Sequence, residues 1–197
     1  MVSLTENEAR AIDLLLRNFK HSYNINQVAR ELDLSPRGAN KILKRLENRN
    51  ILVSEYIGNS KIYSINFAND ATADVCQFVL TGNDTTPYIR TWINDLQPLK
   101  EHTEMAVLFG SVLAKERRAS DIDILIVVKE EKFKRVKNEI EDIEKVKPKE
   151  IHPIFQTPED IIRNIGEEDP VVLRAIRTGM VLWGRDVFVR VIKDGRD

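Results

Sequence analysis

Two hydrophobic segments that each carry polar residues at one end constrain the fold of this chain most strongly. The first ends at Gly110-Ser111, and the second begins with Asp121-Ile122-Asp123. Side chains alternate between the faces of a strand, so the two aspartates project from one face and the isoleucines from the other. Adjacent carboxylates repel each other unless a divalent cation such as Mg²⁺ lies between their oxygens. The pattern predicts two strands and a metal site that acts on a phosphorylated substrate.

The C-terminal part of the chain alternates expected strands and helices. Hydrophobic periodicity predicts strands at 104–109, 121–128 and 149–155, helices near 111–117, 130–146, 158–165 and 169–178, and a last strand or turn at 180–186. The expected fold class is therefore α/β (α+β), with a small mixed sheet flanked by helices over residues 101–197.

The first 67 residues have a different pattern. Amphipathic spacing and cap residues predict helices at 5–19 and 24–32 and a third that begins at Ser35, followed by strands at 52–56 and 61–65. Three helices and a hairpin in this order resemble a winged helix-turn-helix domain, and residues 27–52 are similar to those of many bacterial and archaeal regulators.

That resemblance implies a DNA-binding module over residues 1–67, with the helix from Ser35 in the major groove and the hairpin on the backbone or minor groove. These residues include ten Lys or Arg against seven Asp or Glu, so their net charge is +3, beside −4 for the remainder of the chain. DNA binding at two half-sites implies a homodimer. The alternative is a basic helix face that meets only solvent, or a winged helix that binds protein. The expected DNA contacts are Ser35, Arg37, Lys41, Lys44, Arg45 and Lys61.

Residues 68–100 are expected to form a helical linker that packs on the sheet or mediates self-association.

Composition excludes several other classes of protein and of site. The single cysteine, Cys76, excludes an intrachain disulfide and a multi-cysteine zinc site. No apolar run approaches the roughly 20 residues of a membrane span, and the N-terminus is polar, unlike a signal peptide. We therefore expect a cytoplasmic location and no membrane partner.

The Gly-Ser pair and the two aspartates that follow it resemble the signature of the DNA polymerase beta-like nucleotidyltransferases, specifically their minimal branch. The resemblance implies that Gly110 and Ser111 bind a nucleoside triphosphate and that Asp121 and Asp123 hold Mg²⁺. Arg117 or Arg118 is expected to help neutralise the phosphates. Active relatives place a third carboxylate on a following strand. Here Glu150 is the expected third catalytic group, and His152, which shares its face, is the alternative.

Two functions follow from these resemblances. The first is a DNA-binding enzyme that transfers AMP from ATP to a hydroxyl of a protein or nucleic acid, with a toxin protein as one expected acceptor by analogy to antitoxin nucleotidyltransferases. The alternative is a transcriptional regulator whose nucleotidyltransferase-like domain is inactive and senses a nucleotide or binds a partner protein.

Overall fold

The computed structural model describes residues 3–82 and 85–196, so residues 1–2 and 197 of the expected domains and 83–84 of the expected linker lie outside the described part. The chain divides into two compact units. Unit 1 comprises the residues up to Gly82 together with Arg196, and unit 2 comprises residues from 83 to Gly195. Both helices and two small sheets are present, which confirms the expected fold class.

Unit 1 begins with three helices whose starts are fixed by side-chain caps. The hydroxyl of Thr5, the amide oxygen of Asn24 and the hydroxyl of Ser35 each accept a hydrogen bond from a backbone N–H of the following turn, which satisfies a donor that the helix itself leaves free. The first two are full capping boxes. The helices are α1 (Glu6–Arg17), α2 (Ile25–Glu31) and α3 (Pro36–Asn48).

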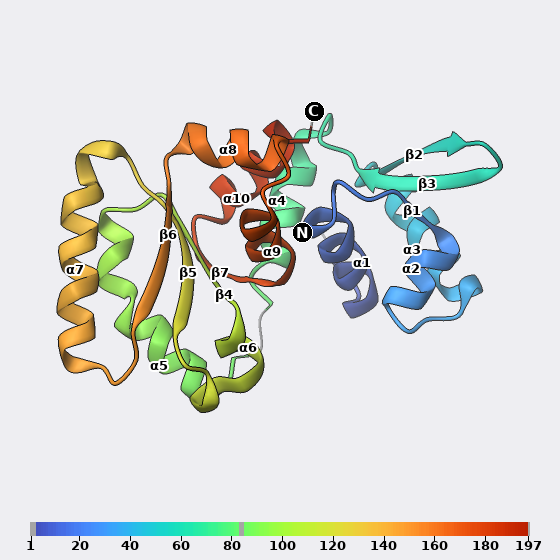
Figure 1. Cartoon of the computed structure of the whole chain (residues 1–197). Helices are drawn as coiled ribbons and strands as arrows, with labels where there is room; N and C mark the ends of the chain where they lie inside the picture. Colours follow the sequence, from blue (N-terminus) through green and yellow to red (C-terminus); the bar gives the residue numbers. More distant parts are fainter. Residues whose placement is uncertain (1–2, 83–84, 197) are drawn as a thin grey trace. The chain divides into compact units, whose positions relative to one another are not determined.

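A three-stranded antiparallel sheet completes the expected domain in unit 1, with strand order β1-β3-β2 (Figure 1). The sequence predicts the hairpin of β2 and β3 but not β1, because a two-residue strand has no periodicity and forms only where Tyr23 meets Tyr63 of β3. The strands are β1 (Tyr23–Asn24), β2 (Leu52–Ile57) and β3 (Ser60–Ile65).

The segment expected as a linker at 68–100 is divided between the units. Helix α4 (Asp70–Val79) contacts α1 in unit 1, and α5 (Pro87–Asp95) belongs to unit 2. The polar residues before α4 make specific contacts: Asn66 and Asn69 both donate to the carbonyl oxygen of Asn50 at 3.0 Å. Their polarity therefore reflects hydrogen bonding to the end of the three-helix segment.

The sheet of unit 2 has the order β6-β5-β4-β7 and is mixed: β5 is parallel to β6 and antiparallel to β4, and β4 is antiparallel to β7 (Figure 1). This register aligns Phe109, Asp123 and His152 in one row across three strands. The strands are β4 (Met105–Phe109), β5 (Ile122–Val127), β6 (Ile151–Gln156) and β7 (Met180–Trp183).

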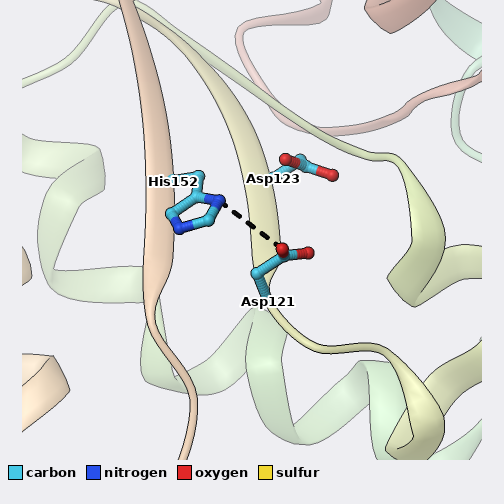
Figure 2. Close-up of side chains that lie close together, drawn as sticks. All are labelled: Asp121, Asp123 and His152. Atoms are coloured by element: carbon cyan, nitrogen blue, oxygen red, sulfur yellow. Dashed lines mark ion pairs between the residues drawn. The ribbon is translucent and has the colours of Figure 1, made fainter.

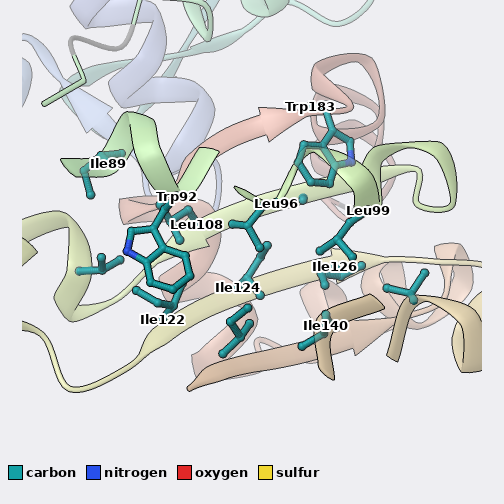
Figure 3. Packing of buried hydrophobic residues seen from close by; sticks show 14 of the residues in the cluster. Ile89, Trp92, Leu96, Leu99, Leu108, Ile122, Ile124, Ile126, Ile140 and Trp183 are labelled. Carbon is teal, nitrogen blue, oxygen red and sulfur yellow. The ribbon is translucent and has the colours of Figure 1, made fainter. Parts of the chain in front are cut away.

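One face of this sheet is covered by α5, the 3-10 helix η1 (Gln97–Glu101) and α7 (Phe133–Val146). Leu108 and Ile124, which pair across β4 and β5, pack there with Trp92 of α5 and Ile140 of α7 (Figure 3). The charged outer side of α7 faces water, as its apolar stripe predicts.

The other face carries Val107 and Phe109 and is contacted by the C-terminal helices. Gly179, directly after α9, approaches Val107 so closely that a Cβ there would overlap its side chain. Helices α9 and α10 both contact β4. The remaining elements of unit 2 are α6 (Ser111–Lys115), the 3-10 helices η2 (Glu116–Arg118) and η3 (Glu130–Lys132), α8 (Pro158–Gly166), α9 (Pro170–Thr178) and α10 (Arg185–Asp194).

The sequence predicts a last strand or turn at 180–186, and the structure has β7 and the following bend there. Helix α10, which follows the bend, is not predicted. Gly184, with φ +73°, makes that bend, and a Cβ there would overlap the backbone of Glu104 and Met105. The apolar spacing of Phe188, Val191 and Ile192, all buried in α10, is the signal that predicts a helix here. Among the described helices of the chain, none is long and apolar enough to cross a bilayer.

Candidate metal and nucleotide site

A glycine turn at the end of β4 brings the strand bearing the aspartates close to the start of α6. Gly110 has φ +78° and ψ −152°, a backbone conformation open essentially to glycine alone. A Cβ at this position would overlap the carboxylate of Asp123. The absence of a side chain at Gly110 therefore leaves the space that the Asp123 carboxylate occupies.

Asp121, Asp123 and His152 form a cluster, defined here as the three-residue site. Each offers one ligand atom, and these atoms all lie within 4.8 Å of one another. Asp121 directly precedes β5, Asp123 lies at its start, and His152 comes from the adjacent parallel strand β6; all three point into the same space (Figure 2). His152 Nδ1 lies 3.6 Å from Asp121 Oδ2. Ser120 also donates to that oxygen at 2.9 Å.

Glu150, expected as the third catalytic carboxylate, does not belong to this three-residue site. Its side chain is 85% exposed, at the residue before β6 begins, and its Oε2 lies 3.5 Å from Nε2 of His152. Alternation along the strand puts both residues on one side, but only His152 is paired in register with Asp123. The structure thus brings the two predicted aspartates together with His152, the alternative to Glu150.

Ser111, the first residue of α6, has a buried hydroxyl oxygen that lacks a hydrogen-bond partner within the described part of the chain. Burying a hydroxyl without a hydrogen-bond partner costs free energy, so the Ser111 hydroxyl is suited to donate a hydrogen bond to a ligand. Together with Gly110 it forms the turn beside Asp123, as the sequence predicts.

The two predicted arginines lie in η2, before Asp121. The Arg117 guanidinium carbon is 6.0 Å from the centre of the Tyr88 ring, and Lys149 Nζ lies 5.8 Å from the same ring. Lys149 also donates to the carbonyl oxygens of Arg117, at 2.9 Å, and of Ala119. Arg118 is exposed. Arg117 is therefore directed to the Tyr88 ring, while Lys149 holds the backbone that leads to the aspartates.

Arg174 of α9 is a basic residue near the site that the sequence does not single out. Its guanidinium carbon lies 5.7 Å from the centre of the Phe109 ring. Phe109 directly precedes Gly110 and pairs in register with Asp123, so the two share a face of the sheet. Because Arg174 comes 51 residues after Asp123, only the packing of α9 on β4 reveals the proximity.

In unit 1 the predicted DNA contacts divide into two groups. Arg37, Lys41 and Lys44 are exposed on α3, at a spacing that places them on one side of the helix. The other three have partners inside the unit. The Ser35 hydroxyl caps α3, Arg45 Nη1 lies 3.2 Å from the buried carboxylate of Glu8, and Lys61 Nζ lies 2.8 Å from Glu47 Oε2.

The ion pair between Lys61 and Glu47 shifts the pKa values of both groups. Hydrogen bonds from Lys61 and Ser54 lower the pKa of Glu47 below its ordinary value, and the bond to Glu47 raises the pKa of Lys61.

Burial raises the pKa of the Cys76 thiol to about 12, so the thiolate required of a nucleophile does not form at neutral pH.

Comparison with known proteins finds a family model that matches the residues around this site. Residues 93–187 match the family model described as "Polymerase beta, Nucleotidyltransferase". No curated protein matches the chain. These 95 residues include Gly110, Ser111 and the whole three-residue site.

Solved structures of ZitR from Lactococcus lactis are weakly similar. A mutant of that protein is 20% identical, over 52% of this chain and 64% of the other, with a TM-score of 0.35. Wild-type ZitR in complex with DNA is 21% identical, over 51% of this chain and 75% of the other, with a TM-score of 0.34. Within unit 2, residues 93–187 are therefore similar to the polymerase beta nucleotidyltransferases.

Proposed function

We propose that the protein is a DNA-binding nucleotidyltransferase that transfers AMP from ATP to a hydroxyl acceptor, with a divalent cation at the three-residue site. The observation that carries the proposal is the convergence of Asp121, Asp123 and His152, with ligand atoms within 4.8 Å, beside the Gly110-Ser111 turn. Carboxylates on one strand of a polymerase beta-like domain are suited to a cation, with Mg²⁺ expected from the resemblance.

The residues fit a metal–nucleotide complex by their chemistry. Asp121 and Asp123 supply oxygen ligands, and the buried hydroxyl of Ser111 can donate to a phosphate oxygen. Gly110, which has no side chain, leaves space for the Asp123 carboxylate beside this turn. The guanidinium of Arg174, near Phe109, adds a positive charge at the same end of β4. A bound divalent cation supplies charge neutralisation of the triphosphate.

The reaction is a single displacement at the α-phosphorus. The acceptor oxygen forms a bond to phosphorus while the bond from phosphorus to the oxygen bridging the α- and β-phosphates breaks. The electron pair and that oxygen leave with pyrophosphate, and the proton of the acceptor hydroxyl passes to water. The residues of the site bind and orient ATP so that the acceptor oxygen faces the α-phosphorus from the side opposite this bond.

The acceptor and the partners follow from the same reasoning. A hydroxyl of a partner protein, such as a toxin, or of a nucleic acid is the proposed acceptor. Unit 1 binds DNA through Arg37, Lys41 and Lys44, which are exposed and, among the described residues, do not take part in the ion pairs that hold Arg45 and Lys61. We expect a homodimer, which would present two copies of α3 to two half-sites.

Incubation with ATP labelled at the α-phosphate tests the enzyme. Purified protein is given Mg²⁺ or Mn²⁺ and a candidate acceptor: its own chain, a protein encoded beside it, or RNA. The wild type is expected to label an acceptor and release pyrophosphate, and the Asp121→Asn plus Asp123→Asn variant is expected to do neither. A Glu141→Gln plus Asp142→Asn variant on the exposed side of α7 is the matched control. Equal labelling by the wild type and the Asp121/Asp123 variant would contradict the proposal.

A second candidate is favoured by the position of Glu150. Since this carboxylate lies outside the three-residue site, the domain has two carboxylates and an imidazole where active relatives have three carboxylates. In this case unit 2 binds nucleotide without transferring it and regulates DNA binding. Equilibrium dialysis with ATP separates the two: ATP binding that changes DNA affinity, with no pyrophosphate release for any acceptor, would favour the regulator.

A further inference from the structure

His152 gives the metal site of unit 2 a ligand type that Mg²⁺ disfavours. Its Nδ1 lies 3.6 Å from the carboxylate oxygen of Asp121, and the residue supplies one ligand atom to the group that includes Asp123 (Figure 2). Mg²⁺ takes hard oxygen ligands in near-ideal octahedral geometry. Imidazole nitrogen instead suits first-row transition cations.

The opposite nitrogen of His152 has a carboxylate partner. Nε2 lies 3.5 Å from Glu150 Oε2, so the imidazole stands between Asp121 on one side and Glu150 on the other. Metal-ligating histidines nearly always present their second ring nitrogen to a carboxylate, carbonyl or water, which fixes the tautomer and the ring orientation. The exposed Glu150 is thus placed to orient His152 rather than to bind metal.

Strand geometry holds this arrangement in place. Asp123 and His152 are register partners on the parallel strands β5 and β6, and the backbone N–H of Ile122 donates to the carbonyl of Glu150 at 3.0 Å. The sheet therefore fixes the backbone positions of Asp123 and His152 relative to each other, and Asp121 directly precedes β5.

We propose that the three-residue site selects a first-row transition cation over Mg²⁺, with Nδ1 of His152 as a metal ligand and Glu150 as its positioning residue. Mn²⁺ is the cation to test, because it shares the octahedral geometry of Mg²⁺, is a first-row transition cation, and is paramagnetic, so that a nitrogen ligand can be detected. The inference rests on the proposed nucleotide site, but it concerns metal selection and does not require turnover.

Electron paramagnetic resonance of Mn²⁺ measures this directly on the full-length protein. Titration gives the affinity for Mn²⁺, competition gives that for Mg²⁺, and pulsed spectra report the hyperfine coupling of a ligating nitrogen. We expect about tenfold tighter binding of Mn²⁺ than of Mg²⁺, and a nitrogen coupling in the wild type. His152→Asp is expected to abolish the coupling and to bring the two affinities within about threefold.

Controls separate ligation from a general loss of structure. His21→Ala, which removes an exposed histidine of unit 1, is expected to leave affinity and coupling unchanged. Glu150→Ala is expected to weaken Mn²⁺ binding by about tenfold, whereas Glu150→Gln, which keeps an acceptor oxygen, recovers most of it. Circular dichroism confirms that each variant is folded.

Two results would overturn the inference: a wild type without nitrogen coupling, or Mg²⁺ bound as tightly as Mn²⁺ in the wild type. Neither result would bear on nucleotide transfer, which is measured separately with labelled ATP. Conversely, nitrogen coupling in a protein that never labels an acceptor would refute the proposed enzyme while leaving the metal selection intact.

Discussion

The missing side chain of Gly110 leaves space for the Asp123 carboxylate in the three-residue site. We expect Gly110→Ala to destabilise unit 2 by about 1–3 kcal/mol, because its φ of +78° and ψ of −152° suit glycine alone and a Cβ would displace Asp123. Mn²⁺ affinity should fall as well. Urea unfolding followed by tryptophan fluorescence and Mn²⁺ titration measure the two effects.

Gly58→Ala is the matched control for this substitution. Gly58 also has a positive φ, +58°, but nothing lies within 4 Å of a Cβ built there. This variant is expected to cost only about 1 kcal/mol in unit 1 and to leave metal binding unchanged. If Gly110→Ala bound Mn²⁺ as the wild type does, the close approach of Asp123 to Gly110 would be irrelevant to the site.

Glu8 is a buried carboxylate whose protonation affects the stability of unit 1. Burial alone would raise its pKa, but hydrogen bonds from Thr5 and Arg45 outweigh burial and hold the pKa below the ordinary 4.5. A carboxyl group whose pKa is lower in the folded state stabilises the protein above the unfolded-state pKa. This stabilisation is lost as the pH falls from about 4.5 through the folded-state pKa.

We therefore expect Glu8→Gln to lower the free energy of unfolding of unit 1 by about 1–3 kcal/mol at pH 7, with a smaller difference below about pH 4. Hydrogen exchange of the α1 amides at both pH values checks this. The exposed Glu6, in the same helical turn, supplies the control Glu6→Gln. An undiminished difference at low pH would show that ionisation of Glu8 is not the cause.

At the scale of elements, α3 presents a basic side that the ion pairs of unit 1 leave available. We expect Arg37→Ala plus Lys41→Ala to weaken binding to the DNA upstream of the coding sequence and to reduce the slope of log affinity against log salt by about 2. Fluorescence anisotropy at several salt concentrations measures both. Lys134→Ala plus Lys137→Ala, an exposed pair on α7, is the control. Equal affinities for the two double variants would exclude this side of α3 as the DNA contact.

The elements also show what local sequence patterns can predict. Helices α1 and α3 and strands β4 and β5 follow from caps and hydrophobic periodicity, which are local properties. Strand β1 depends on a partner, since Tyr23 is a strand residue only through pairing with Tyr63. The polar segment before α4 resembles a linker in sequence, but the side chains of Asn66 and Asn69 both donate hydrogen bonds to the carbonyl oxygen of Asn50.

For the whole molecule, two separate cores predict two unfolding transitions. Leu43 is fully buried in unit 1 and Ile126 in unit 2. Both tryptophans, Trp92 and Trp183, belong to unit 2, so their fluorescence reports that unit alone. We expect Leu43→Ala to destabilise unit 1 by about 2–5 kcal/mol in circular dichroism without moving the fluorescence midpoint.

The reciprocal variant provides the check. Ile126→Ala is expected to lower the fluorescence midpoint and to leave hydrogen exchange in the core of unit 1 unchanged. A shift of the fluorescence midpoint by Leu43→Ala of the same size as that caused by Ile126→Ala would show that the units unfold together.

The sequence by itself determines the strands, the turn at Gly110 and the pair Asp121 and Asp123, because alternation and glycine conformation are local rules. It leaves open whether Glu150 or His152 completes the site. Only the tertiary structure shows where these two residues lie, because the parallel register of β5 and β6 sets Asp123 opposite His152 and leaves Glu150 before the strand. Arg174 likewise reaches the end of β4 only through the packing of α9, a long-range contact that no local pattern encodes.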